Sequence, residues 1–154
     1  MNLRQTTPND QIDLKKIYFN SINSIDENIY THTQKIAWSS QAWDNKNFDQ
    51  ILVDGKGWII EDMNKYIAFA IRFPKNKLAL LYCIGESQRI GVGTKLLKRI
   101  EEDAQAEGIS TLITEASLIS YKLLLMHNWK IIRKEKINIK ESIFERYKMI
   151  KNIG

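Results

Sequence analysis

Hydrophobic residues recur at helical spacing in some parts of the chain and at strand spacing in others, which predicts the order of its elements. A short strand is expected from Leu3 to Gln5. Thr7 and Pro8 then form a typical helix start, and apolar residues three and four positions apart continue the helix. The side chains expected on its buried face are Leu14, Ile17, Tyr18, Ser21 and Ile22. Ser24 and Glu27 match a second capping box, so another helical region is predicted to begin there.

Strand spacing dominates the middle of the chain. Runs rich in β-branched and aromatic residues predict three strands, from Trp58 to Glu61, from Lys65 to Phe73 and from Lys77 to Ile84. The residues between these runs, 62–64 and 74–76, are typical of turns. Because the connections are so short, we expect the three strands to form a meander.

Helical spacing returns after two glycines, Gly91 and Gly93. The apolar positions of this helix are Val92, Leu96, Leu97, Ile100 and Ala104. Gly108 is expected to end it. The elements expected next are a strand from Thr111 to Glu115, a short helix from about Leu118 to His127, and strands from Trp129 to Ile139 and from Phe144 to Ile150. This order predicts a mixed α+β fold with helices on the faces of a mixed sheet.

The composition is that of an ordinary globular protein. The chain has 154 residues, 44% of them apolar and 27% charged, so a single domain over residues 1–154 can bury a core. Cys83 is the one cysteine and cannot form an internal disulfide, and no stretch resembles a secretory leader. We therefore expect a reducing, cytoplasmic location. No run of about 18 apolar residues occurs, so no membrane-spanning helix is expected.

The charge balance is basic, with a net charge of +5 and a pI of about 9.2, which suits an anionic ligand. A nucleic acid is not the partner we expect, because the lysines and arginines are scattered along the chain. The loose basic cluster between Arg133 and Lys140 fits either a solvated strand face or a contact with a polyanion. His32 and His127 stand far apart, with no carboxylate or cysteine at ligand spacing, so no metal site is expected.

The stretch from Gln88 to Thr94 joins a strand to a helix through a tight turn with two glycines. Backbone N–H groups are unpaired at such a turn, and the positive end of the helix dipole attracts anions, so a phosphate site is predicted. Two known patterns do not fit. A dinucleotide site needs a third glycine where Leu96 stands, and a P-loop needs lysine before threonine, whereas Thr94 precedes Lys95. A purely structural turn remains the alternative.

The pattern that remains is Gln88, Gly91 and Gly93, placed directly after the last strand of the meander. Here the chain resembles the GNAT superfamily of N-acetyltransferases, in which Gln or Arg, two variable positions, Gly, any residue, and Gly or Ala follow the fourth strand. The order of elements is also similar. Similarity to the small bacterial YafP-like branch is carried by Tyr30, Ala37–Trp38, Leu80–Tyr82, Ala116–Ser117 and Tyr147–Met149.

The resemblance implies an α/β fold of the GNAT-like acyl-CoA N-acyltransferase type, with N-terminal helices, a central mixed sheet of about six or seven strands and a C-terminal hairpin. It also implies acetyl-CoA as co-substrate. Backbone N–H groups from Arg89 to Thr94 would hold the pyrophosphate, and the fourth strand would offer its backbone to the pantetheine. The residues implied in cofactor binding are Tyr82, Cys83, Ile84, Gln88, Arg89, Ile90, Gly91, Val92, Gly93, Thr94 and Ser117.

The sequence departs from the family at the acid that protonates the leaving thiolate. In the family this acid is usually a tyrosine four residues before a glycine. Asn128 stands at the glycine position, so Leu124 takes the place of the tyrosine. Tyr121, one turn earlier on nearly the same face, is the candidate substitute, with packing as its alternative role. Glu115 is the candidate catalytic base, with capping of the next helix as its alternative role.

The acceptor is expected to be a primary amine of a small molecule or a peptide. An amine with a pKa near 7.8 costs about 1 kcal/mol to deprotonate at pH 7, against about 4.6 kcal/mol for a lysine-like amine, which favours α-amines. Tyr30 and Trp38 are expected to line the acceptor cleft, with Trp43, Asp44 and Glu86 as further candidates. A GNAT-fold acyl-CoA-binding module that acts without catalysis, as a sensor or interaction partner, is the alternative function. A homodimer is possible.

Overall fold

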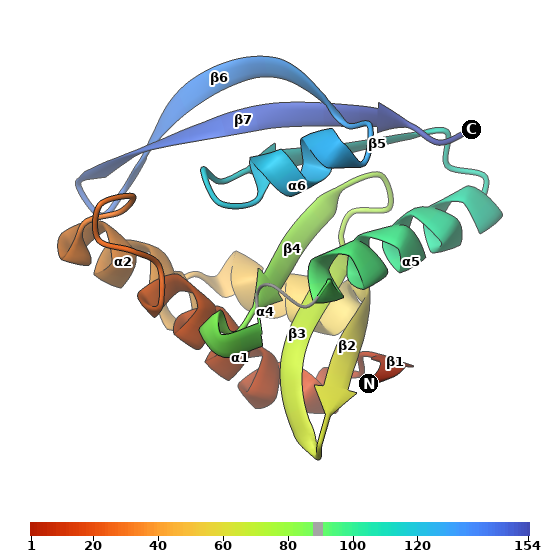
Figure 1. Ribbon diagram of the computed structural model, residues 1–154, viewed down its shortest axis with the longest axis horizontal. Helices are drawn as coiled ribbons and strands as arrows, with labels where there is room; N and C mark the ends of the chain where they lie inside the picture. The colour runs from red at the N-terminus through yellow and green to blue at the C-terminus, as the bar shows by residue number, and fades with distance from the viewer. Residues whose placement is uncertain (88–90) are drawn as a thin grey trace.

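The computed structural model describes residues 1–87 and 91–154, and its elements follow the order shown in Figure 1. The helices are α1 (Gln11–Asn23), α2 (His32–Ser39), α3 (Gln41–Asp44), α4 (Lys46–Asp54), α5 (Val92–Ala106) and α6 (Tyr121–Met126). The strands are β1 (Asn2–Gln5), β2 (Lys56–Asp62), β3 (Lys65–Arg72), β4 (Leu78–Cys83), β5 (Thr111–Ala116), β6 (Lys130–Ile139) and β7 (Ser142–Asn152). Single 3₁₀ turns cover Pro8–Asp10 and Gly85–Ser87. The mixed α+β fold expected from the sequence is confirmed.

The strands form two antiparallel sheets with the orders β1-β2-β3-β4 and β5-β7-β6. Strands β2 to β4 are the expected meander, in which Phe69 lies opposite both Ile59 and Tyr82. The two sheets meet at a parallel bridge between Lys77 and Ile113, next to the N-terminal end of β4. Because β4 and β5 are joined at that end alone among the described residues, the C-terminal end of β4 is left beside the helices α1 and α5 (Figure 1).

Helix α1 begins where the sequence predicts. The Asp10 carboxylate accepts hydrogen bonds from the Thr7 N–H at 2.7 Å and from the Arg4 guanidinium at 2.8 and 3.0 Å. This aspartate therefore joins β1 to the start of the helix. The side chains expected on the inner face of α1, from Leu14 to Ile22, are all buried.

The expected second capping box at Ser24 and Glu27 is wrong. Ser24 ends α1 instead, and its hydroxyl donates to the Ser21 carbonyl oxygen at 2.9 Å. The box lies at Thr31 and Gln34, where the Thr31 Oγ1 accepts from the Gln34 N–H at 3.1 Å and the Gln34 Oε1 accepts from the Thr31 N–H at 2.8 Å. Both pairs satisfy the same spacing rule, but the hydroxyl of Ser24 is already bonded to the helix that precedes it.

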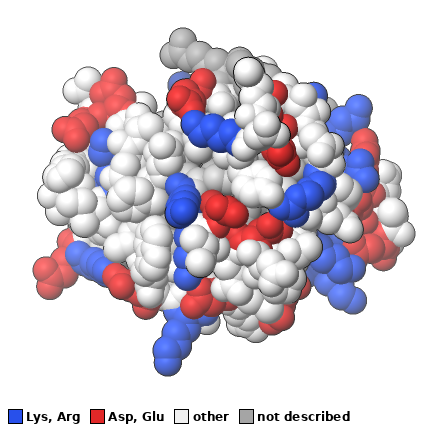
Figure 2. All heavy atoms as spheres, turned by 90° about the horizontal axis from the view of Figure 1, so that it is seen from below, with Lys and Arg blue, Asp and Glu red and all other residues white. Residues whose placement is uncertain are grey.

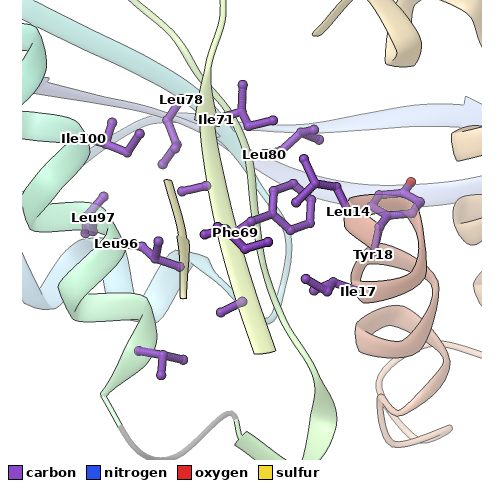
Figure 3. Close-up of a cluster of buried hydrophobic side chains, with 14 of the residues drawn as sticks. Leu14, Ile17, Tyr18, Phe69, Ile71, Leu78, Leu80, Leu96, Leu97 and Ile100 are labelled. Carbon is purple, nitrogen blue, oxygen red and sulfur yellow. The ribbon is translucent and has the colours of Figure 1, made fainter. Parts of the chain in front are cut away.

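The core lies on both faces of the first sheet. Helix α5 covers one face with Leu96, Leu97 and Ile100, and α1 covers the other (Figure 3). The apolar positions predicted for α5 are all buried. The helix ends at Gly108, as expected, where φ is +82° and the Ile109 N–H donates back to the Ala104 carbonyl at 3.0 Å. Among the described helices, none has both the length and the apolar run needed to cross a membrane.

The C-terminal part is a long hairpin of β6 and β7, which reaches from β5 to α2 (Figure 1). Lys140 and Glu141 have positive φ values of +48° and +69° at its turn. Helix α6 begins later than expected, at Tyr121, because the Ser117 hydroxyl accepts from the N–H groups of Ile119 and Ser120 and holds a separate turn in front of it.

Candidate functional site

A cavity of about 330 Å³ lies at the beginning of α5, between α1, the end of β4 and the segment before α6. We call it the α5 cavity. Five residues predicted to bind the cofactor line it, namely Tyr82, Cys83, Gly91, Gly93 and Ser117. The fold thus brings residues that are distant in the sequence together around one cavity. Gln88, Arg89 and Ile90, predicted for the same role, lie outside the described residues.

The first turn of α5 presents backbone N–H groups at this cavity. Gly91 precedes the helix with φ +79°, a conformation that favours glycine, and its carbonyl accepts the first helical bond from the Lys95 N–H at 3.2 Å. The backbone N–H groups of Val92, Gly93 and Thr94 come before the first N–H that donates within the helix, and they stand at the positive end of the helix dipole. The Val92 side chain is fully buried in the core, so only its backbone is available to a ligand.

The first turn of α5 is tied to the end of α6. The Thr94 Oγ1 lies 3.2 Å from the His127 Nε2, and both side chains are half-buried. Sequence reasoning assigned His127 no role, because nothing in its spacing indicates that α6 ends beside α5. When the His127 Nε2–H donates to it, the Thr94 hydroxyl keeps its own hydrogen to donate to a phosphate oxygen.

The end of β4 contributes differently from residue to residue. Cys83 is half-buried, and burial raises the pKa of its thiol to about 11, so the thiol stays protonated near neutral pH. Ile84 lies outside the cavity lining. Its N–H donates to the Ile67 carbonyl and its own carbonyl accepts from the Ser87 N–H, each at 2.9 Å, so the structure engages both groups within the protein.

A second cavity, of about 380 Å³, adjoins the first and is called here the aromatic cavity. The two share Trp38, Leu81, Tyr82, Ser117 and Ser120. We call these shared residues the junction of the two cavities, because each of them lines both. Sequence reasoning missed Ser120 at this junction, although its spacing of three from Ser117 indicates a shared turn.

Seven aromatic side chains line the aromatic cavity, Tyr18, Tyr30, Trp38, Phe48, Phe73, Tyr82 and Phe144. Several contact one another edge to face, for example Tyr18 with Tyr82 at 4.7 Å and Tyr30 with Trp38 at 5.1 Å between ring centroids. Tyr30 and Trp38, predicted to line the acceptor cleft, both line this cavity, and their role toward an acceptor stays a prediction. Burial raises the pKa of Tyr18 and of Tyr82, so both hydroxyls remain protonated at neutral pH.

The other three residues proposed for the acceptor cleft stand elsewhere. Trp43 is 56% exposed and packs on Phe19 with ring centroids 5.8 Å apart. Asp44 pairs with Lys140, and Glu86 pairs with Lys65. None of the three is among the described residues that line either cavity.

Charged side chains close one side of the aromatic cavity. Glu115 lies there, its Oε2 is 2.8 Å from the Lys77 Nζ, and its role as the base stays a prediction. The Arg146 Nη2 is 4.0 Å from the Glu115 Oε1, and the Arg146 Nε is 2.7 Å from the Glu135 Oε1. Sequence reasoning missed Lys77 and Arg146, because β4, β5 and β7 come together only in the folded chain.

The structure places Tyr121 away from both cavities. Its ring packs on Tyr147 with centroids 4.5 Å apart, and it is not among the described lining residues. Leu124, at the position where the family has a tyrosine, is 1% exposed and lines the aromatic cavity. The residues shared by the two cavities that carry a hydroxyl are Tyr82, Ser117 and Ser120, and the two serine oxygens are 3.2 Å apart.

A family model described as the acetyltransferase (GNAT) family matches residues 19–124. The structure is similar to a GCN5-related N-acetyltransferase from Rhodopseudomonas palustris, with 23% identity, a TM-score of 0.91, and coverage of 98% of this chain and 94% of that chain. It is also similar to the PaiA N-acetyltransferase from Thermoplasma acidophilum in complex with coenzyme A, with 16% identity, a TM-score of 0.73 and 99% coverage of both chains.

A third similar structure is YncA, an acetyltransferase from Salmonella typhimurium with its cofactor acetyl-CoA. The identity is 14%, the TM-score 0.66, and the coverage 100% of this chain and 94% of that chain. No curated protein matches the chain. At these identities the solved structures establish the fold.

Proposed function

Because the chain belongs to the GNAT acetyltransferase family, we propose that it transfers an acetyl group from acetyl-CoA to a primary amine by direct attack in a ternary complex. The observation that carries this proposal is the junction of the two cavities at Trp38, Tyr82 and Ser117. The α5 cavity begins at a helix N-terminus, which is suited to bind a pyrophosphate. The aromatic cavity is lined by aromatic rings and charged side chains, which are suited to bind an amine.

We assign the α5 cavity to acetyl-CoA. The amides of Gly93 and Thr94, with the segment 88–90, hold the pyrophosphate, and the pantetheine extends along Tyr82 and Cys83 toward Ser117. This assignment is supported by similar structures that contain coenzyme A or acetyl-CoA. A Cβ at position 93 would lie 2.8 Å from the Leu123 side chain, so glycine also allows α6 to approach this turn.

The reaction joins the amine nitrogen to the thioester carbonyl carbon and breaks the carbon–sulfur bond, with coenzyme A leaving as a thiolate. Two proton transfers complete it. Glu115, at the edge of the aromatic cavity, is the proposed acceptor of the proton that the amine loses. In place of Tyr121, we propose that a hydroxyl of Tyr82, Ser117 or Ser120 gives its proton to the leaving sulfur and regains one from solvent.

A second candidate function is an acyl-CoA-binding module without catalysis. It is favoured by one observation, the placement of Leu124 where the family has a tyrosine and of Tyr121 against Tyr147. Both functions require the α5 cavity to bind acetyl-CoA, and they differ only in whether an amine releases the thiol.

Two variants at glycines of similar backbone conformation test the binding step. Gly91 and Gly108 stand at opposite ends of α5 with φ values of +79° and +82°, and a Cβ at either position would meet nothing within 4 Å. Gly91→Glu and Gly108→Glu should therefore be similarly destabilised. At about 100 times the dissociation constant, acetyl-CoA should stabilise the wild type and Gly108→Glu by about 2.7 kcal/mol, but not Gly91→Glu.

Thermal unfolding with and without acetyl-CoA measures this difference. A wild type that acetyl-CoA does not stabilise would overturn both candidate functions, and stabilisation of Gly91→Glu would show that the turn has another role. Release of free thiol across a panel of primary amines then separates the enzyme from the binding module. Binding without any release would favour the module.

The remaining interpretations stay proposals. Membership of the YafP-like branch rests on short matches such as Ala37–Trp38 and Ala116–Ser117. A cytoplasmic location and a homodimer are likewise predictions, to be tested by fractionation and by measuring the mass in solution.

A further inference from the structure

The charges around the aromatic cavity are balanced. Two cations, Lys77 and Arg146, and two carboxylates, Glu115 and Glu145, line it. Each carboxylate already has a cationic partner, since Glu115 pairs with Lys77 at 2.8 Å and the Glu145 Oε2 lies 2.6 Å from the Lys134 Nζ. The Lys134 ammonium holds the pKa of the Glu145 carboxyl below its ordinary value. A polycationic acceptor would find no uncompensated negative charge among these side chains.

One cation has hydrogen-bonding capacity to spare. The Arg146 Nε is bonded to Glu135, whereas the Arg146 Nη2 is 4.0 Å from Glu115, beyond hydrogen-bond distance. Among the described residues, none makes a hydrogen bond to either terminal nitrogen of this guanidinium. Arg146 lines the cavity, and the two parallel N–H donors of a guanidinium can bind a carboxylate bidentately.

Arg146 also stands at the right place along its strand. In the antiparallel pairing of β5 with β7, Ala116 lies opposite Tyr147, so one further step of this register brings Arg146 opposite Ser117. Ser117 belongs to the junction of the two cavities. An anionic group held by Arg146 is therefore close to the junction where an amine must meet the thioester. The amine and the carboxylate of an α-amino acid are separated by a single carbon, which fits so short a span.

Much of the remaining lining is apolar. Beyond the aromatic rings, Leu78, Leu80, Ile137 and Ile139 line the cavity, while Gln41, Asn45, Asn47 and Thr114 add polar groups. A volume of about 380 Å³ is in the range of small-molecule sites, and its rings and branched side chains would bury an apolar group. The cavity therefore offers an apolar compartment, a carboxylate receptor and a route to the donor.

We propose that the acceptor is a free α-amino acid, or a close analogue, with an aromatic or branched apolar side chain. This inference rests on the proposed function and gives its acceptor. Arg146 holds the carboxylate, the rings of Tyr30, Trp38 and Phe144 surround the side chain, and the α-amine is directed to the junction. Polyamines and other polycations are excluded by the balanced charge, and a peptide N-terminus lacks the α-carboxylate that Arg146 would bind.

The chain provides a matched control for Arg146. Arg133 pairs with the same carboxylate, its Nε lying 3.3 Å from the Glu135 Oε2, but it is not among the described residues that line the cavity. In Arg146→Gln, Glu135 keeps Arg133, and in Arg133→Gln it keeps Arg146. Each variant therefore removes one of the two arginines that pair with Glu135, and only Arg146→Gln changes a residue that lines the cavity.

The experiment compares the wild type, Arg146→Gln and Arg133→Gln by thiol release from acetyl-CoA. The acceptors are phenylalanine, leucine and tryptophan, the amides of the same amino acids, and spermidine. For the wild type and Arg133→Gln we expect kcat/KM to be at least about tenfold higher for an acid than for its amide. Arg146→Gln should abolish this preference, mainly by raising KM for the acids, and spermidine should be the poorest acceptor.

A binding measurement accompanies the rates. With coenzyme A present, phenylalanine should raise the melting temperature of the wild type and of Arg133→Gln but not of Arg146→Gln. The acceptor inference is overturned if amides or spermidine are preferred, or if the two variants behave alike. Stabilisation by acetyl-CoA with release by other amines leaves the proposed function intact, whereas failure of acetyl-CoA to stabilise the wild type overturns the function itself.

Discussion

At the scale of single residues, the sequence predicts best where a residue type dictates a backbone conformation. Gly91 and Gly108 were placed correctly, at the start and the end of α5, because a positive φ favours glycine. Side-chain roles that depend on distant partners were harder. Arg146 and His127 acquire their roles from strands and helices that the chain brings together, and no local pattern marks them.

The bond between Thr94 and His127 gives a prediction for donor binding. Thr94→Val keeps the side-chain shape and removes the hydroxyl, which we propose donates to the pyrophosphate. We expect acetyl-CoA to bind about five- to tenfold more weakly, since one hydrogen bond of this kind contributes about 1 kcal/mol. Acetylpantetheine lacks the pyrophosphate, and its affinity should not change. Isothermal titration calorimetry with both ligands measures the difference.

Thr111 provides the control for this substitution. Its hydroxyl also makes one side-chain hydrogen bond, to the Asn152 Oδ1 at 3.3 Å, in the pairing of β5 with β7. Thr111→Val should leave the affinity for both ligands at the wild-type value. An equal loss of affinity for acetyl-CoA and acetylpantetheine in Thr94→Val would contradict a contact with the pyrophosphate.

At the scale of elements, hydrophobic spacing predicted helices and strands well and their ends less well. The buried faces of α1 and α5 contain the residues expected from a helical repeat, because burial of one face is what produces the repeat. The ends of α2 and α6 depend on single hydroxyl groups. The same short pattern fits Ser24 and Thr31, and only the folded chain shows which hydroxyl caps a helix.

The corrected capping box can be tested by stability. Thr31→Ala removes the hydroxyl that accepts from the Gln34 N–H, and we expect the free energy of unfolding to fall by about 1 kcal/mol. Ser24→Ala removes a bond at the exposed end of α1 and should cost less than about 0.5 kcal/mol. Urea unfolding followed by circular dichroism compares the two. A larger loss of stability for Ser24→Ala than for Thr31→Ala would instead favour the capping box predicted at Ser24.

At the scale of the whole molecule, the sequence established the order of elements and the family, but not which charges meet. Ion pairs such as Lys77–Glu115 and Arg4–Asp10 connect different elements, so their formation depends on the complete fold. On the face drawn in Figure 2, the excess basic charge of +5 does not gather in one patch. Figure 2 shows Lys and Arg intermixed with Asp and Glu over the face seen there, which fits a small anionic ligand better than a long polyanion.

The Arg4–Asp10 pair ties the N-terminal strand to the rest of the molecule and should make stability depend on pH. Arg4 binds both carboxylate oxygens of Asp10 and also donates to the Tyr66 hydroxyl at 2.9 Å. The hydrogen bonds from Arg4 lower the pKa of the Asp10 carboxyl. A carboxyl whose pKa is lower in the folded state than in the unfolded state stabilises the folded state. For an aspartate this contribution is complete above the unfolded pKa, near 3.9, and is lost as the pH falls through the folded pKa.

Asp10→Asn should therefore lower the free energy of unfolding by about 2 kcal/mol at pH 7, because it removes hydrogen bonds to a charged group. The difference from the wild type should shrink as the pH falls below about 4, since asparagine does not titrate. Asp54→Asn, at an exposed position, is the control and should follow the wild-type curve. Urea unfolding between pH 3 and pH 7 measures these differences. A gap between Asp10→Asn and the wild type that stays constant with pH would show that the Asp10 charge does not link folding to protonation.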